Sequence, residues 1–198
     1  GQTLKIILEL LSAAGYKVYS KVLNSINYGV PQMRERIYLV GIRKDLVNKD
    51  QDFVWPEPIK TPNLGDYLID DSELGFDEKK VAYVTFSKYL ENKYNKGLFK
   101  VSKLLQEAGL VLDTRQSDLR LYSKRVPTLR TGRHGILYVK NGKFRRLSGF
   151  ESLLLQGFPT KTAQKAKGKI TDTYLLSQAG NAMTVSVIEK IGRQLIDY

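Results

Sequence analysis

The chain has 198 residues, 42% of them hydrophobic and 26% charged, a balance typical of a globular protein with one sizeable core or two small ones. Its formal net charge of +12 favours a polyanionic partner, and nucleic acid is the preferred one. Binding to an anionic membrane, or solubility alone, would also explain the charge. The absence of cysteine excludes disulfides, cysteine-rich metal sites and a thiol nucleophile from this chain, and a single histidine, His134, excludes a multi-histidine site.

The first forty-two residues predict one helix and two strands. Apolar residues at i, i+3, i+4 and i+7 indicate a helix over residues 3–14 that ends at Gly15. Strands are expected at 17–23 and 36–42, and the second is apolar on both faces, which suits a strand covered by helices on each side. No apolar run reaches the roughly 20 residues that cross a bilayer, and the first segment lacks a basic start and a cleavage site, so we expect a cytoplasmic protein.

Residues 44–97 break into proline-containing and acidic stretches, which predicts a connection with short elements. An apolar stripe from Leu98 to Ala108 then indicates a helix that stops at Gly109. Beyond it the chain becomes basic and strand-like, with ten Lys or Arg against two Asp in residues 111–150. A segregated basic patch of this kind is typical of nucleic-acid-binding proteins.

A β-hairpin is the clearest local signal, at residues 136–147. Its centre is Asn141-Gly142, which supplies the two positive-φ positions of a type I′ turn. Directly after it, Ser148 and Glu151 form a capping box before a run of leucines, so a short helix is expected there.

The last part of the chain passes through a lysine-rich stretch, residues 160–169, to the pair Gly180-Asn181. Taken alone, this pair predicts a simple turn before a helix that starts at about Thr184.

Residues 31–36 place polar side chains at the mouth of the second strand. Arg34 and Arg36 point to the same side if this segment is already extended. The spacing alone favours an exposed loop with ordinary surface arginines, and the alternative is a pair of guanidinium groups that bind a phosphate or a base carbonyl.

Three segments together resemble the DNA cytosine-5 methyltransferase family, in the family's order. Residues 27–41 resemble its Gln-x-Arg-x-Arg motif, 146–159 its Arg-Leu, Glu, Gln-Gly-Phe-Pro motif, and 178–187 its final Gly-Asn motif with the following helix. The resemblance covers almost the whole chain except residues 44 to about 113.

The resemblance implies that a cytosine is flipped out of the duplex, attacked by a cysteine, and methylated at C5 from S-adenosyl-L-methionine. It assigns Gln32, Arg34 and Arg36 to the catalytic base pocket, with Arg36 at the cytosine O2 and Arg34 supporting the pocket or a phosphate. Gly180 and Asn181 match the segment that closes over the cofactor, where a glycine permits close backbone approach. Ala182, the third expected cofactor residue, stands where the family commonly has serine.

Residues 126–129 resemble the Thr-Leu pair of the family's recognition regions, and arginines surround this pair. Some are expected to bind phosphates and a few to read base edges, and the alternative is a solvated basic face. The expected DNA-binding residues are Arg115, Arg120, Arg125, Thr128, Arg130 and Arg133. His134 is expected to be structural or exposed, and the cluster of Arg146, Glu151 and Gln156 to be scaffold.

The family's glycine-rich cofactor loop, Pro-Cys nucleophile and Glu-Asn-Val segment are all absent, so we expect this chain alone to be catalytically silent. An expressed fragment is favoured over one chain of a split enzyme and over a domain kept for binding only. The missing N-terminal catalytic half is therefore an expected partner, beside double-stranded DNA. The apolar stripes of the first and last helices would be exposed without it, which predicts association.

The expected fold is α/β and discontinuous. Residues 1–45 and 170–198 are assigned to a partial catalytic methyltransferase domain, and 46–169 to a connection and a smaller, strand-rich target-recognition domain. The leading hypothesis is part of a DNA cytosine-5 methyltransferase, in a restriction-modification role. A non-catalytic basic nucleic-acid-binding module and an RNA-modifying relative are the alternatives.

Overall fold

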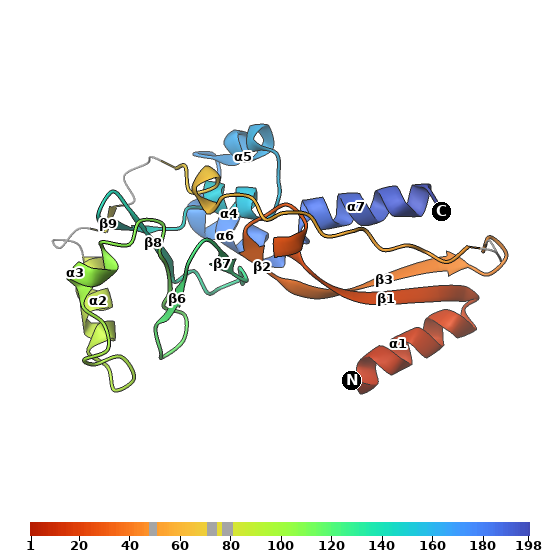
Figure 1. Cartoon of the computed structure of the whole chain (residues 1–198), viewed down its shortest axis with the longest axis horizontal. Helices are drawn as coiled ribbons and strands as arrows, with labels where there is room; N and C mark the ends of the chain where they lie inside the picture. Colours follow the sequence, from red (N-terminus) through yellow and green to blue (C-terminus); the bar gives the residue numbers. More distant parts are fainter. Residues whose placement is uncertain (48–50, 71–74, 77–80) are drawn as a thin grey trace.

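In the computed structural model, which describes residues 1–47, 51–70, 75–76 and 81–198, a β-hairpin arm extends from a lobe that contains a larger sheet (Figure 1). Helix α1 (Gln2–Ala13) leads through Gly15, whose φ is +89°, into β1 (Tyr16–Asn24). β1 pairs antiparallel with β3 (Glu35–Arg43). The first expected helix, its glycine terminator and both strands are thereby confirmed.

One face of the hairpin carries its core. Helix α7 (Val185–Ile196) runs along this face (Figure 1) and packs Val187 and Ile191 into it. The buried side chains of β3 alternate along the strand and are Tyr38, Val40 and Ile42.

The opposite face of the hairpin is open, which corrects the expectation of a helix on each side. Ile37 and Leu39 are 46% and 36% exposed, and α1 contacts β1 without burying any of its own residues. The reason is that α1 is held at its C-terminal end, where Lys44 Nζ donates to Ser12 O at 2.9 Å, while its N-terminal end lies away from the strands (Figure 1).

A segment without regular structure, residues 51–63, returns along the hairpin to the lobe. Tyr28 Oη donates to Pro56 O at 3.2 Å, and Ile59 N donates to Asn27 O at 2.8 Å. These bonds fasten the connection to the loop that precedes Gln32. A 3₁₀ turn over Leu64–Asp66 follows, and another, Ser25–Asn27, lies between β1 and Gln32.

The lobe contains a five-stranded antiparallel sheet in the order β4-β9-β8-β5-β6. The predicted hairpin is confirmed as β8 and β9, and both turn residues have positive φ, 53° at Asn141 and 67° at Gly142. The strands are β4 (Gly75–Phe76), β5 (Val111–Asp113), β6 (Arg120–Tyr122), β8 (Ile136–Lys140) and β9 (Lys143–Arg146).

Helices cover both faces of this sheet, because its side chains alternate between two cores. α2 (Val81–Leu90) and α3 (Val101–Leu104) pack on one face, where Leu112, Leu137 and Phe144 point. Residues 98–108 were expected to be one helix, but α3 spans only four of them and Leu98 is 71% exposed. Gly109, with φ +76°, does end that segment as predicted.

The other face of the sheet packs against α4 (Gly149–Leu155), whose capping box is confirmed: the Ser148 side chain accepts from Glu151 N, and the Glu151 side chain accepts from Ser148 N. α5 (Thr160–Ala166) and α6 (Asp172–Asn181) follow. Gly180 and Asn181 therefore lie in the last turn of a helix, which corrects the expectation of a turn outside one. No helix among the described residues is both long and apolar enough to cross a membrane.

Candidate nucleic-acid interface

Gln32 lies in β2 (Gln32–Met33), which pairs in parallel with β7 (Val126–Pro127). Its side chain is fully buried, and both ends of its amide are used. Nε2 donates to Leu155 O at 2.9 Å, and Oε1 accepts from Leu129 N at 3.1 Å. Gln32 thus connects α4 to the loop after β7, and it has no free edge for a base. We correct its expected catalytic role to a positioning one.

Arg34 is 4% exposed and joins the loop after β7 to the end of α6. Nη1 donates to Leu129 O at 2.9 Å, while Nη2 donates to Gly180 O at 3.1 Å and to Ala182 O at 2.9 Å. Burial lowers the pKa of the guanidinium, and the nearby charge of Arg36 lowers it further. Both terminal nitrogens of Arg34 donate to backbone carbonyls, which disfavours binding to a phosphate. Of the two roles expected for Arg34, these contacts favour support of the pocket.

Arg36, two residues further along β3, is exposed and donates from Nη1 to its neighbour Glu35 O at 2.6 Å. No acidic side chain among the described residues forms an ion pair with it. Its charge contributes to the lowered pKa of Arg34. Of the three motif residues, Arg36 is therefore the one with donors available to a ligand.

The loop after β7 is fastened to both neighbouring segments. Thr128 Oγ1 donates to Met33 O at 2.6 Å, and Thr131 Oγ1 donates to Asn181 Oδ1 at 2.6 Å. A Cβ added at Gly180 would lie 2.4 Å from the backbone nitrogen of Thr131. This glycine therefore permits a close approach to the chain's own loop, and its expected contact with the cofactor stays a prediction. Asn181 is exposed, and Ala182 is half-buried.

Buried polar side chains continue this network toward α7. Gln156 donates from Nε2 to Ala179 O and accepts from Thr184 Oγ1 at 3.1 Å, and Thr184 Oγ1 lies 2.7 Å from Ser25 Oγ. The scaffold role expected for Gln156 agrees with these contacts. Ser25 and Thr184 were missed, because a buried serine or threonine leaves no signal in a single sequence.

Arg115 is held within the lobe. Its side chain is 6% exposed, it forms two 2.7 Å hydrogen bonds to the Asp113 carboxylate, and Nη1 donates to Thr128 O at 2.7 Å. Each of its three side-chain nitrogens already donates within the lobe, which disfavours the DNA-binding role expected for it. It positions the carbonyl that precedes Leu129.

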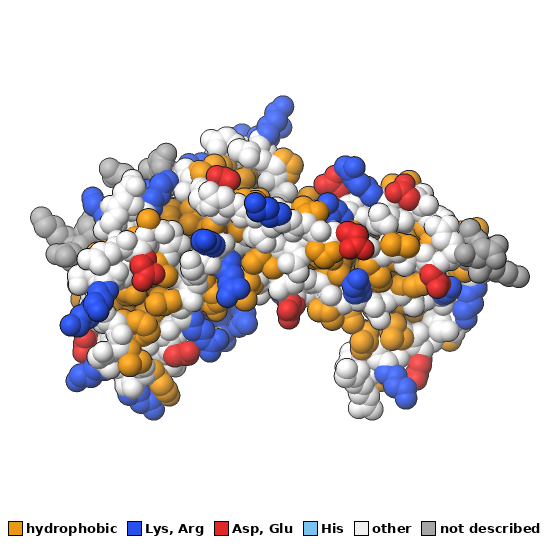
Figure 2. Space-filling view, in the orientation of Figure 1, with side chains coloured by type: hydrophobic (Ala, Val, Ile, Leu, Met, Phe, Trp, Pro, Cys, Tyr) orange, Lys and Arg blue, Asp and Glu red, His pale blue; other side chains and the backbone are white. Residues whose placement is uncertain are grey.

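The other predicted DNA-binding arginines are exposed, and Figure 2 shows Lys and Arg side chains gathered over β6 and β7. Arg120 pairs with Asp118 at 2.9 Å, whereas Arg125, Arg130 and Arg133 form no ion pair among the described residues. A hollow of about 130 Å³ lies among them and is lined by Arg120, Thr128 and Arg130. His134 is half-buried, with Nε2 3.2 Å from Ser177 Oγ, which fits the structural role expected for it.

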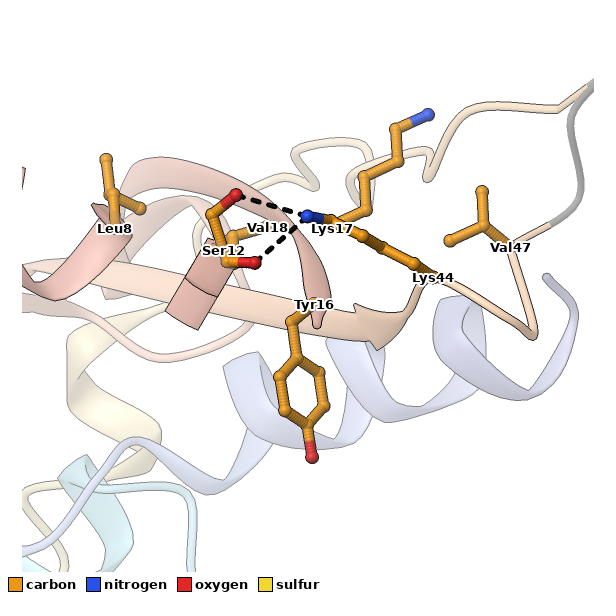
Figure 3. Close-up of a pocket in the computed structure, with 7 residues that line it drawn as sticks. All are labelled: Leu8, Ser12, Tyr16, Lys17, Val18, Lys44 and Val47. Atoms are coloured by element: carbon orange, nitrogen blue, oxygen red, sulfur yellow. Dashed lines mark hydrogen bonds between the residues drawn. The ribbon is translucent and has the colours of Figure 1, made fainter. Parts of the chain in front are cut away.

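A larger hollow of about 500 Å³ lies between α1 and β1, at the Tyr16 end of the hairpin (Figure 3). Its apolar part includes Leu8 and Val18. Both of its lysines are engaged: Lys17 pairs with Asp52 at 2.7 Å, and Lys44 bonds Ser12. It is consequently a packing surface of the open hairpin face, separate from Arg36.

This arrangement agrees with comparisons to known proteins. The model of the C-5 cytosine-specific DNA methylase family matches residues 1–197, and the chain belongs to this family. It is 35% identical over 199 residues to the type II methyltransferase M.NlaX of Neisseria lactamica, covering 98% of this chain and 57% of that protein. It is 30% identical to M.HhaI of Haemophilus parahaemolyticus, covering 96% and 57%. The chain thus spans little more than half the length of these relatives.

Among solved structures, the chain resembles Spodoptera frugiperda DNMT2, with a TM-score of 0.64 at 16% identity, covering 99% of this chain and 62% of that one. It also resembles the Entamoeba histolytica methyltransferase EhMeth, with a TM-score of 0.63. These likenesses confirm the predicted α/β methyltransferase fold class. The family assignment confirms the resemblance seen in the three motifs, and the cofactor of this family is S-adenosyl-L-methionine.

Proposed function

We propose that the chain carries the target-base arginine and the DNA-reading surface of a cytosine-5 methyltransferase that acts on duplex DNA. The observation that carries this proposal is the geometry around Arg34. One buried guanidinium holds the loop that begins at Thr128 and the end of α6 together, two residues before the exposed Arg36. A flipped cytosine needs such a fixed cation next to a surface that grips the DNA.

In this mechanism Arg36 donates to the O2 of the flipped cytosine and stabilises negative charge that develops on the ring. Gln32 and Arg34 fix the segment from which Arg36 projects, so their contribution is preorganisation. Thr128 and the exposed arginines bind the DNA and set its register. The chain has no cysteine, so the thiolate that attacks the ring has to come from residues outside these 198.

The end of α6 fits a role beside the cofactor. The Asn181 side chain is exposed, and its amide nitrogen has no hydrogen bond among the described residues, so this group is available to hold S-adenosyl-L-methionine. The cofactor supplies the methyl group. Arg34 joins this segment to the loop after β7, because it donates to the carbonyls of Gly180 and Ala182 and to that of Leu129.

The open hairpin face fits the remainder of a methyltransferase domain. Val22, Ile37 and Leu39 are 59%, 46% and 36% exposed, and α1 presents Ile6 and Leu10 on its surface. Exposed apolar surface of this extent is typical of a site where another domain or subunit packs. We propose that the catalytic half that carries the nucleophile lies on it, either in the same chain or as a second subunit. The type II names of the relatives support a restriction-modification role.

A second candidate is a basic module that binds nucleic acid without catalysis, which the lack of cysteine and the exposed arginines favour. Transfer of labelled methyl groups from S-adenosyl-L-methionine to duplex DNA separates the two. The chain is tested alone and together with the part of M.NlaX that it does not match. Activity only in the mixture is the result expected for the methyltransferase. DNA binding without activity in the mixture would favour the binding module.

A further inference from the structure

The turn that follows α2, residues 91–97, lies outside the three family motifs and is fastened to the recognition lobe by two asparagines. Asn95 is 1% exposed; its Nδ2 donates to Tyr89 O and Ser117 O, and its Oδ1 accepts from Leu119 N at 2.8 Å. Asn92 Nδ2 also donates to Ser117 O, at 2.9 Å. These bonds fix the turn against residues 117–119, which lead into β6.

The side chains that this turn presents are basic and aromatic. Lys93 and Lys96 are exposed, Tyr94 is 51% exposed, and Lys93 Nζ lies 4.9 Å from the centre of the Tyr94 ring. Glu91 is the one acidic residue of the turn, and the nearby Asp118 is already paired with Arg120. The turn therefore adds a positive, hydrogen-bonding surface to its side of the lobe.

This surface is continuous with the one that carries the exposed arginines Arg120, Arg130 and Arg133. Lys93 and Tyr94 line an open hollow together with Arg133, and Gln116 forms part of its wall. Gln116 also lines the neighbouring hollow that contains Arg120 and Arg130. Tyr89 Oη donates to Gln116 O at 2.8 Å, which holds this shared wall in place. One polyanion lying across the exposed arginines can therefore reach the turn.

We propose that the turn of residues 91–97 is an additional DNA contact, in which Lys93, Lys96 and the Tyr94 hydroxyl bind the phosphate backbone beside the bases that the arginine region reads. A lysine binds a phosphate as a point charge. Contacts to the DNA backbone position a protein on the duplex without reading the base sequence. The two asparagines hold the turn in advance, which reduces the ordering cost of binding. The inference rests on the proposed DNA-binding function.

The test is the salt dependence of binding to duplex DNA by fluorescence anisotropy, for wild type, the double variant K93A/K96A and the double variant K161A/K165A. The second pair removes the same charge from exposed positions of α5, on the opposite edge of the lobe in Figure 1. Two lost phosphate contacts lower the log–log salt slope by about 1.8 and weaken binding at 0.1 M salt by roughly tenfold or more. The α5 pair is expected to keep the wild-type slope, and circular dichroism checks that each variant folds.

Equal slopes for the two double variants, with wild-type binding intact, would overturn the contact and leave the proposed function standing. If wild type itself does not bind duplex DNA, the proposed function fails and the contact fails with it. Tyr94→Phe adds a second measurement, because it keeps the ring and removes the hydroxyl. It is expected to weaken binding several-fold without changing the salt slope.

Discussion

Replacement of Arg34 by methionine tests whether this buried guanidinium holds the interface together. The change leaves three carbonyl oxygens, those of Leu129, Gly180 and Ala182, without their donor. A buried polar group without a partner costs about 1–3 kcal/mol. The Leu129 residue is 3% exposed and bears this cost in full, whereas Gly180 and Ala182 are half-buried and their carbonyls can turn toward water.

A second effect opposes this loss. Burial lowers the pKa of Arg34, which means that the folded state already bears the cost of desolvating its charge, and methionine removes that cost. The net expectation is a decrease of about 2–4 kcal/mol in the free energy of unfolding. Arg34→Lys keeps the cation and up to three donors, so it is expected to fall between wild type and Arg34→Met.

Urea unfolding followed by the fluorescence of Trp55, the single tryptophan, measures this decrease. Arg36→Met is the matched control, since it removes the same side chain two residues away at an exposed position, where changes are usually within about 0.5 kcal/mol. If Arg34→Met and Arg36→Met unfold at the same urea concentration, Arg34 does not fasten the loop, and the reasoning is refuted.

Three further changes test other parts of the structure by the same unfolding assay. Gly180→Ala places a methyl group 2.4 Å from a backbone nitrogen and is expected to lower the free energy of unfolding by about 1–3 kcal/mol or more. Gly192→Ala, which has open space within α7, is expected to raise it by up to about 1 kcal/mol. Equal effects of the two variants would contradict the close approach at Gly180. Asp113→Asn breaks a buried ion pair with Arg115 and is expected to cost about 3–5 kcal/mol, and a loss below about 1 kcal/mol would show that the pair is not needed. Burial raises the pKa of Glu151 above its ordinary 4.5, so the stability that the protonated side chain contributes below that pH is lost as the pH rises through the folded-state pKa. Glu151→Gln is expected to lose less stability than wild type as the pH is raised from 4.5, and an equal loss would refute this.

The sequence was sufficient wherever a local rule determines the structure. The stripe of α1 with Gly15 at its end, the Asn141-Gly142 turn and the capping box at Ser148 each depend on neighbouring residues only. The three motifs also identified the family, which the match over residues 1–197 confirms.

The sequence was insufficient where contacts between distant parts of the chain determine the structure. Arg115 and Arg130 look alike in the chain, yet the carbonyl of Thr128, which folding brings to Arg115, helps to hold the first side chain within the lobe, whereas the second is exposed. Gly180 lies in the last turn of α6, where the backbone of Thr131 approaches it too closely for a Cβ, and no local pattern predicts this approach. β3 is apolar on both faces, but among the residues that the structure describes only one face has a helix packed fully against it.

The division of the chain into domains 1–45 with 170–198 and 46–169 stays a prediction. The structure does join the two parts closely. β2 pairs with β7 across that division. Gln32 bonds across it to Leu155 and Leu129, and Arg34 bonds to residues of both parts. Hydrogen bonds of this kind favour a fixed orientation between the lobe that contains the five-stranded sheet and the segment that carries Arg36.

Methyl transfer to duplex DNA by the mixture of this chain and the unmatched part of M.NlaX is the most direct test of the central claim, that Arg36 contacts the target base. Arg36→Ala is compared with Arg43→Ala, an exposed arginine at the other end of the same strand that pairs with Asp45. The account predicts that Arg36→Ala lowers the rate of transfer by about 10²–10³-fold, with DNA binding retained, while Arg43→Ala stays near wild type. Equal rates for the two variants would contradict it.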